Sequence, residues 1–119
     1  MSLPNRIRLS TNASEKLKQL KMHTGLTPNI LARTAIMLTV SSNTGIRNAS
    51  VSDIDGLELN KSVLFGDHVD YYELLLEQYR HEQQLDENAS KLIPALVEVG
   101  VHKLGHVKKI SDLTSALLV

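Results

Sequence analysis

The chain has 119 residues and no net formal charge, and its hydrophobic content of 42% suits one folded domain and excludes a disordered chain. Aromatic residues make up only 3%, so we expect an aliphatic core, which favours helices over a β-sandwich or barrel. The absence of cysteine excludes disulfides, thiolate metal sites and cysteine nucleophiles. The sequence has neither a signal peptide nor an apolar stretch near the ~18 residues that span a membrane. We therefore expect a cytoplasmic protein with no membrane partner.

The charge is distributed unevenly along the chain. Residues 1–50 contain seven Lys and Arg against one acid, Glu15, a net charge of +6, whereas residues 51–119 have a net charge of −6. Such asymmetry is typical of a chain that binds an anionic partner with one part. The simpler alternative is that the two parts pair with each other, within the fold or between subunits.

Residues 5–10 alternate between polar and apolar side chains, which is the pattern of a half-buried strand. The residues expected to face outward are Arg6, Arg8 and Ser10, and those expected to face the core are Ile7 and Leu9. The alternation therefore predicts a strand with a basic outer face.

A helix is predicted over residues 12–23, with Ser10, Thr11 or Asn12 as its cap and Gly25 as a left-handed end. Its narrow apolar stripe consists of Ala13, Leu17 and Leu20, and the lysines that flank this stripe are Lys16, Lys18 and Lys21.

A second helix is predicted to begin at once, because Thr27 is a favoured N-cap and Pro28 suits the first helical position. Apolar residues cover most of this helix up to Val40, so it should be buried on all sides. A chain of this size struggles to bury such a helix alone. We therefore expect it to pack against another subunit.

The next part of the chain begins with a polar loop over residues 41–55. A short strand is predicted over residues 57–60 and an apolar turn over residues 63–66. Asp67 is a plausible N-cap for a helix over residues 68–84.

The last predicted helix covers residues 86–104 and contains Pro94, so it either starts near that proline or kinks there. The tail over residues 110–119 has helical spacing and should dock onto the fold. Together these elements predict one compact, mainly α domain over the whole chain, 1–119. It would have a basic strand-helix-helix part over residues 1–40 and an acidic helical part over residues 56–119.

The first forty residues follow the element order of a ribbon-helix-helix module, which is a strand, a helix, a glycine turn and an apolar helix. In such a module two chains pair their strands, and the outer side chains reach a DNA groove. The N-terminus of the second helix, with Thr27, Asn29 and the backbone after Pro28, would suit a phosphate. The candidate DNA contacts are Arg6, Arg8, Lys16, Lys18 and Lys21. Arg33 is a weaker candidate that would suit a buried ion pair. The alternative is an edge strand whose basic side chains only block aggregation.

Several segments resemble the DndE family of DNA sulfur modification proteins. The most specific match is Thr24-Gly25-Leu26-Thr27-Pro28-Asn29, and the others are Leu3-Pro4-Asn5-Arg6, Leu17-Lys18, Gly56-Leu57-Glu58-Leu59-Asn60, Leu64-Phe65-Gly66 and Val99-Gly100-Val101-His102-Lys103-Leu104. The matches cover most of the chain. They fail in the loop over residues 41–55 and in the tail after His106.

This resemblance implies a part in DNA phosphorothioation, where sulfur replaces a non-bridging oxygen of the DNA backbone. Other proteins of the system would supply the sulfur and ATP chemistry, and this chain would be a DNA-binding accessory. The resemblance also implies a homotetramer, a fold related to ribbon-helix-helix and a preference for nicked over intact double-stranded DNA. A protein that recognises backbone shape would favour a nick, because a nicked duplex is more flexible.

Enzymatic alternatives are weakly supported. Two sets of side chains have a spacing suited to a metal: Asp53, Asp55 and Glu58, and Glu98, His102 and His106. The first set lies in a polar loop, where such acids are usually solvated, and the second lacks the Glu of the H-E-x-x-H motif. We expect no catalytic residues, no metal and no cofactor.

Two further classes remain open. One is a ribbon-helix-helix transcription regulator or antitoxin, which would read bases and lose ~1–3 kcal/mol per wrong base pair. The other is a structural adaptor that never contacts DNA.

Overall fold

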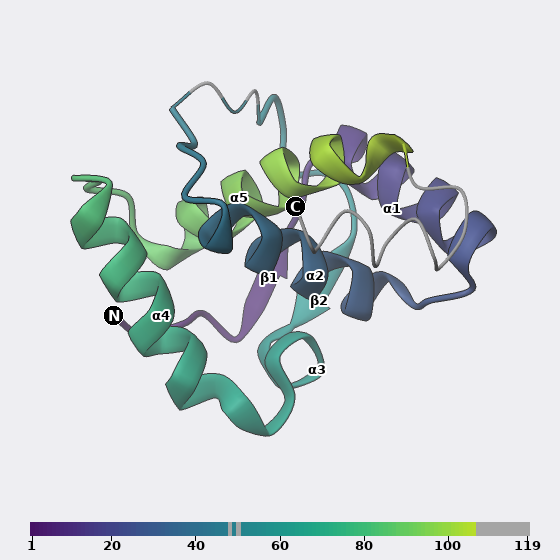
Figure 1. The fold of residues 1–119 in the computed structure, drawn as a ribbon. Coiled ribbons are helices and arrows are strands. Elements are labelled where there is room, and N and C mark those ends of the chain that lie inside the picture. Colours follow the sequence, from purple (N-terminus) through teal and green to yellow (C-terminus); the bar gives the residue numbers. More distant parts are fainter. Residues whose placement is uncertain (48, 50, 107–119) are drawn as a thin grey trace.

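The computed structural model describes residues 1–47, 49 and 51–106. Helices form most of it, as predicted, and a two-stranded sheet lies among them (Figure 1). The elements in chain order are β1 (Arg6–Arg8), α1 (Thr11–Thr24), α2 (Pro28–Ser41), β2 (Glu58–Asn60), α3 (Lys61–Phe65), the 3-10 turn η1 (Gly66–His68), α4 (Val69–Glu82), α5 (Ala89–Lys103) and the 3-10 turn η2 (Leu104–His106). The buried side chains form one core that draws on both the basic and the acidic part of the chain.

The two strands form an antiparallel ribbon, β1 with β2, within one chain. β1 pairs with β2 in antiparallel register, with Ile7 opposite Leu59 and Arg8 opposite Glu58. Ile7 and Leu59 are buried while Arg6 and Arg8 are exposed, so the predicted alternation is confirmed here. β1 therefore pairs with a strand about fifty residues further along the same chain. In a ribbon-helix-helix module the corresponding strand would come from a second chain.

Ser10 departs from the predicted alternation. It was expected to face outward, but it is buried because it is the N-cap of α1. Its hydroxyl accepts a hydrogen bond from the Ala13 N–H and donates one to the Glu98 carboxylate at 2.6 Å. Gly25 ends α1 in the left-handed conformation (φ 76°), as predicted.

Helices α2 and α5 pack side by side through the middle of the molecule, and they contact each other more than any other pair of elements (Figure 1). The buried residues of α2 are Leu31, Ala32, Ala35, Ile36, Leu38 and Thr39. The premise that the chain alone struggles to bury this helix was wrong, because α5 is largely apolar and covers α2 within the chain. Packing of α2 against another subunit stays a prediction.

The contact between these helices is unusually close at Gly100. A Cβ atom there would overlap the backbone of Ala35, so only glycine allows the two backbones to approach this far. Nearby, the Thr39 hydroxyl donates a hydrogen bond to the Leu96 carbonyl at 2.9 Å. Gly100 therefore sets the distance between α2 and α5.

The segment between β2 and α4 is more helical than predicted. The expected apolar turn is the end of α3, and Asp67 lies inside η1 and does not cap α4. The residue at the N-cap position of α4 is His68, which makes no capping hydrogen bond with its side chain. On the inner side of α4, Tyr72, Leu76 and Tyr79 are buried, as the helical spacing predicted.

Helix α5 begins later than predicted and continues through its proline. Asn88 is the N-cap, because its side chain accepts a hydrogen bond from the Lys91 N–H, and Pro94 lies inside the helix. The predicted docking of the tail over residues 110–119 falls outside the described residues. In the part of the chain that the structure describes, no helix is long and apolar enough to cross a membrane.

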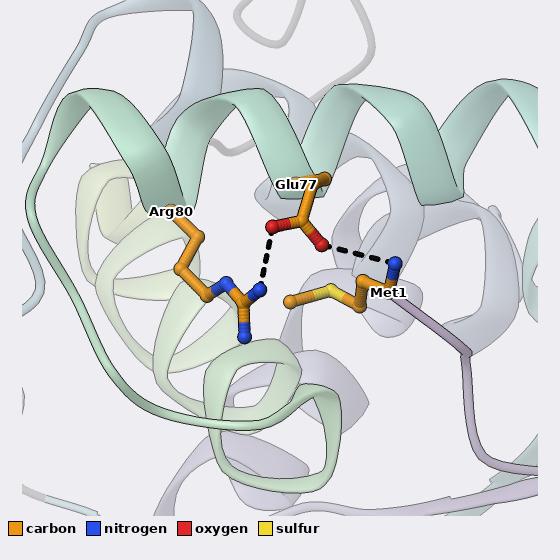
Figure 2. A network of polar contacts seen from close by, with 3 residues as sticks. All are labelled: Met1, Glu77 and Arg80. Carbon is orange, nitrogen blue, oxygen red and sulfur yellow. Dashed lines mark hydrogen bonds and ion pairs between the residues drawn. The ribbon is translucent and has the colours of Figure 1, made fainter.

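A polar network ties α4 to the first residue of the chain (Figure 2). Glu77 pairs with the amino group of Met1 at 3.0 Å and accepts a hydrogen bond from the Arg80 guanidinium. The bond from Arg80 and the one from Met1 hold the pKa of Glu77 below its ordinary value. This network positions α4 and has no part in the candidate surface described below.

Candidate nucleic-acid interface

The two arginines of β1 share one acidic partner. Arg6 and Arg8 lie on the outer face of the ribbon, and both pair with Glu58 on β2, at 3.7 Å and 3.6 Å. The side chains of Arg6 and Arg8 are 75% and 54% exposed, so these ion pairs contribute little to stability. Glu58 nevertheless removes part of the positive charge that the alternating pattern of β1 suggested, and the sequence alone did not reveal this pairing.

The three lysines of α1 do not form one group. At about 100° per residue, Lys18 and Lys21 lie on one flank of the buried stripe and Lys16 lies on the other. Lys18 and Lys21 are exposed, and in the described part of the chain neither forms an ion pair. Lys16 is half-buried and faces a hollow beside α5. The predicted five-residue set is therefore divided among three places.

The N-terminus of α2 follows directly after the end of α1 that carries Lys21. Thr27 caps α2, because its hydroxyl accepts a hydrogen bond from the Ile30 N–H, and Pro28 occupies the first turn, as predicted. This first turn contains no acidic residue. The Lys18–Lys21 surface, defined as these two lysines with the start of α2 at Thr27, thus combines two exposed cations with a positive helix end.

Arg33 has a structural role, and among the described residues it does not form the buried ion pair that the sequence suggested. Its guanidinium donates to the carbonyls of Leu64 at 2.6 Å and Val63 at 3.2 Å. Arg33 thereby satisfies the carbonyl groups at the end of α3 and holds that short helix against α2.

The residues with metal-ligand spacing serve other purposes. Asp53 accepts hydrogen bonds from the Thr11 N–H and hydroxyl, both at 2.9 Å, at the start of α1. A hydrogen bond from the Asp55 N–H lowers the pKa of Asp53 the most, and the two bonds from Thr11 lower it further. Among the described residues, no three His, Asp or Glu side chains are close enough together to bind one metal ion.

The second set likewise forms no metal site among the described residues. Glu98 is buried, with 7% of its surface exposed, and it accepts hydrogen bonds from Ser10 and from the Asn12 amide at 2.9 Å. His102 is exposed one turn further along α5, and the side chain of His106 lies outside the described part of the structure. The i, i+4 spacing of Glu98 and His102 was visible in the sequence, but their joint position at a hollow with Lys16 was not.

A comparison with protein families decides which family this sequence represents. The sequence profile described as DNA sulphur modification protein DndE matches residues 6–112. The chain belongs to the DndE family. The DndE family takes part in DNA phosphorothioation, so the resemblance found in the sequence is confirmed.

Two solved DndE structures have the same fold. The crystal structure of DndE from Escherichia coli B7A, described as involved in DNA phosphorothioation modification, is 38% identical, with a TM-score of 0.69. A DndE G21/24K mutant, described as involved in DNA phosphorothioation, is 33% identical, with a TM-score of 0.68. Both alignments cover 87% of this chain and 99% of the other chain. No curated protein is significantly similar to the chain in sequence.

Proposed function

We propose that this DndE protein is a DNA-binding accessory of phosphorothioation that contacts the DNA backbone and has no catalytic centre of its own. The observation that carries the proposal is the Lys18–Lys21 surface, in which two exposed lysines without an ion pair to any described residue follow one another toward the acid-free N-terminus of α2. Cations and helix N-termini are the groups that proteins use to bind phosphate oxygens.

The ribbon has a smaller part in this proposal than its sequence suggested. Arg6 and Arg8 remain exposed enough to reach phosphates, but each would exchange its contact with Glu58 for one with DNA. Lys16 is expected to contribute least to DNA binding, because it is half-buried on the other flank of α1. The main contacts are therefore expected from Lys18 and Lys21.

We expect recognition of the DNA backbone rather than of bases, because lysines and a helix N-terminus bind phosphate oxygens. A nicked duplex bends at a lower free-energy cost than an intact one, so its backbone reaches the protein surface more easily. We therefore expect tighter binding to nicked than to intact double-stranded DNA. Other proteins of the modification system would perform the sulfur chemistry, and this chain would hold or present the DNA to them.

The proposal includes a homo-oligomer, with a tetramer as the expected form. Because α5 already covers α2, the contact between subunits is expected elsewhere, and α4 exposes two large side chains one turn apart, Tyr71 (59% exposed) and Leu74 (69% exposed). Sedimentation equilibrium measures the mass directly. A mass of one chain at micromolar concentration would contradict the oligomer without touching the DNA proposal.

A binding titration tests the DNA-binding function. Fluorescence anisotropy with intact and singly nicked duplexes of several unrelated sequences, each at two salt concentrations, measures affinity, sequence preference and the number of phosphate contacts. We expect tighter binding to the nicked duplex, little dependence on sequence and a steep dependence on salt.

Two other outcomes would favour the alternatives. Tight binding to a single intact sequence, with a loss of ~1–3 kcal/mol per wrong base pair, would indicate a regulator that reads bases. No binding to any duplex would leave the basic surface as a contact site for partner proteins and would end the DNA proposal for the isolated protein.

A further inference from the structure

A hollow of about 490 Å³ lies between α1, α5 and the loop that follows α2. Its size falls within the ~300–1,000 Å³ of pockets that bind small molecules. The polar side chains around it are Asn12, Lys16, Thr44, Glu98, His102 and Lys103. This hollow is separate from the Lys18–Lys21 surface, because it lies on the opposite flank of α1.

One end of the hollow is a hydrogen-bond acceptor. The buried Glu98 carboxylate accepts one hydrogen bond on each oxygen, from the Ser10 hydroxyl at 2.6 Å and from the Asn12 amide at 2.9 Å. A carboxylate accepts up to about four hydrogen bonds, so each oxygen retains capacity for a donor from a ligand. Hydroxyl and amino groups are such donors, whereas a phosphate placed there would be repelled.

The other end of the hollow is cationic. On α1, Lys16 follows Asn12 by one turn, and on α5, Lys103 follows Glu98 by five residues. At 1.5 Å and 100° per residue, Lys16 lies about 6 Å along α1 from Asn12 on nearly the same side. Lys103 lies roughly 7.5 Å along α5 from Glu98 and roughly 140° around that helix, and both lysines line the hollow. His102 adds a ring N–H donor near Lys103.

We propose that this hollow binds a nucleotide, with its phosphate between Lys16 and Lys103 and a sugar hydroxyl or base amino group at Glu98. A phosphate monoester with a donor group several ångströms away satisfies both ends of the hollow, whereas inorganic phosphate or an uncharged nucleoside satisfies only one. The nucleotide is either a free mononucleotide or the phosphorylated end of a DNA strand. This proposal goes beyond the duplex-binding function and stands independently of it.

An NMR titration of the full chain tests the proposal. The probes are AMP, adenosine, inorganic phosphate and a tetradeoxynucleotide with and without a 5′-phosphate, and the backbone amides of Thr44, Gly45, His102 and Lys103 report binding. We expect AMP to shift these amides, and adenosine and phosphate each to bind about tenfold more weakly, since each loses one set of charge-assisted or polar contacts.

The two sources of the nucleotide give different rankings. Tighter binding of the phosphorylated tetranucleotide than of AMP, with loss of affinity when its 5′-phosphate is absent, assigns the hollow to a strand end. Equal or tighter binding of AMP assigns it to a free nucleotide. Either ranking supports the proposal.

Matched variants locate the binding within the hollow. Lys103→Ala should weaken AMP binding about tenfold, the usual cost of losing one charge-assisted hydrogen bond to phosphate. Lys91→Ala, an exposed lysine at the other end of α5, should leave it unchanged. Glu98→Gln should reduce the preference for AMP over phosphate, and a thermal melt verifies that this buried variant is folded.

Three results would overturn the proposal. The first is the absence of shifts at the hollow with about 10 mM AMP, a concentration well above a millimolar Kd. The second is that inorganic phosphate alone gives shifts equal to those with AMP. The third is that the Lys103→Ala and Lys91→Ala proteins bind AMP with equal affinity. A Lys18→Ala/Lys21→Ala protein separates the nucleotide proposal from the duplex-binding proposal. It should lose affinity for duplex DNA and keep its affinity for AMP.

Discussion

Helices α1 and α2 have equal lengths and follow each other in the chain, yet the rest of the molecule surrounds them differently. α1 buries one stripe, which consists of Ala13, Leu17, Leu20 and Thr24, and leaves its lysines outside. α2 is buried on most sides, because α5 packs along it and α1 and α3 lie beside it. The environment of α1 could be inferred from its own sequence, whereas the environment of α2 depends on a helix about sixty residues away.

This difference separates stability from the proposed function. The α2–α5 pair supplies close to half of the hydrophobic residues of the core, and these side chains are buried. The exposed side of α1 contributes little to the core and carries the cations proposed to bind DNA. Substitutions in the α2–α5 pair should therefore reduce stability, whereas substitutions on the exposed side of α1 should reduce DNA binding.

The largest effect is expected at Ile36, which is completely buried in α2. Ile36→Asp places an unpaired carboxylate in the core, which should destabilise the fold by about 3 kcal/mol or more and prevent stable folding. Circular dichroism and thermal melting measure the loss.

The matched control for this variant is Ile30→Asp in the first turn of the same helix, where the side chain is 41% exposed. It should cost about 1 kcal/mol or less. A well-folded Ile36→Asp protein with a near-native melting temperature would contradict the burial of α2 by α5.

A smaller loss is expected from Gly100→Ala. The added Cβ would push α5 away from the Ala35 backbone, and overpacking of this kind costs about 1–3 kcal/mol. The control is Gly105→Ala, because a Cβ at Gly105 meets no described residue within 4 Å. Chemical unfolding measures the difference in stability between the two variants. Equal stabilities of the two variants would show that the helices separate without strain.

The double variant Lys18→Ala/Lys21→Ala should leave stability nearly unchanged and weaken DNA binding evenly across sequences. Each lost phosphate contact reduces the salt dependence of binding by about one unit of slope, so the pair should reduce it by about two. Anisotropy titrations at several salt concentrations give the slope, with Lys91→Ala as the control for loss of an exposed lysine elsewhere. A slope equal to that of the unmodified protein would remove these lysines from the interface.

The smallest effect concerns acid stability. The folded-state pKa of Asp53 is lowered by hydrogen bonds from the Asp55 N–H and from Thr11. Its contribution is therefore fully present above the ordinary aspartate pKa of about 3.9 and is lost as the pH falls through the lower folded value. Asp53→Asn should be less stable than the unmodified protein at neutral pH, and this difference should shrink below about pH 4.

Urea unfolding at neutral and acidic pH measures this change, with Asp55→Asn as the neighbouring control. A stability difference between Asp53→Asn and the unmodified protein that stays constant with pH would show that the charge of Asp53 has no part in capping α1.

The sequence predicted the features that depend on neighbouring residues. Ser10 or its neighbours as the cap of α1, Gly25 as its end and the Thr27-Pro28 start of α2 all follow from local hydrogen bonding and backbone geometry. The strand over residues 57–60 was found from its alternation, although its partner was not. For the candidate site, the sequence proposed five cations, and it did not show which of them lie together. Their contact with DNA stays a prediction.

The sequence by itself determined a mainly helical fold, the ends of the first two helices and membership of the DndE family, because capping, periodicity and specific residue matches are written in short segments. Only the tertiary structure decided that β1 pairs with β2, that α5 covers α2, that Glu58 pairs with both ribbon arginines and that Lys16 lines the same hollow as Glu98 and Lys103. These arrangements join residues dozens of positions apart. They are fixed by how apolar faces and close backbone contacts such as Gly100 against Ala35 fit together, and not by any local pattern.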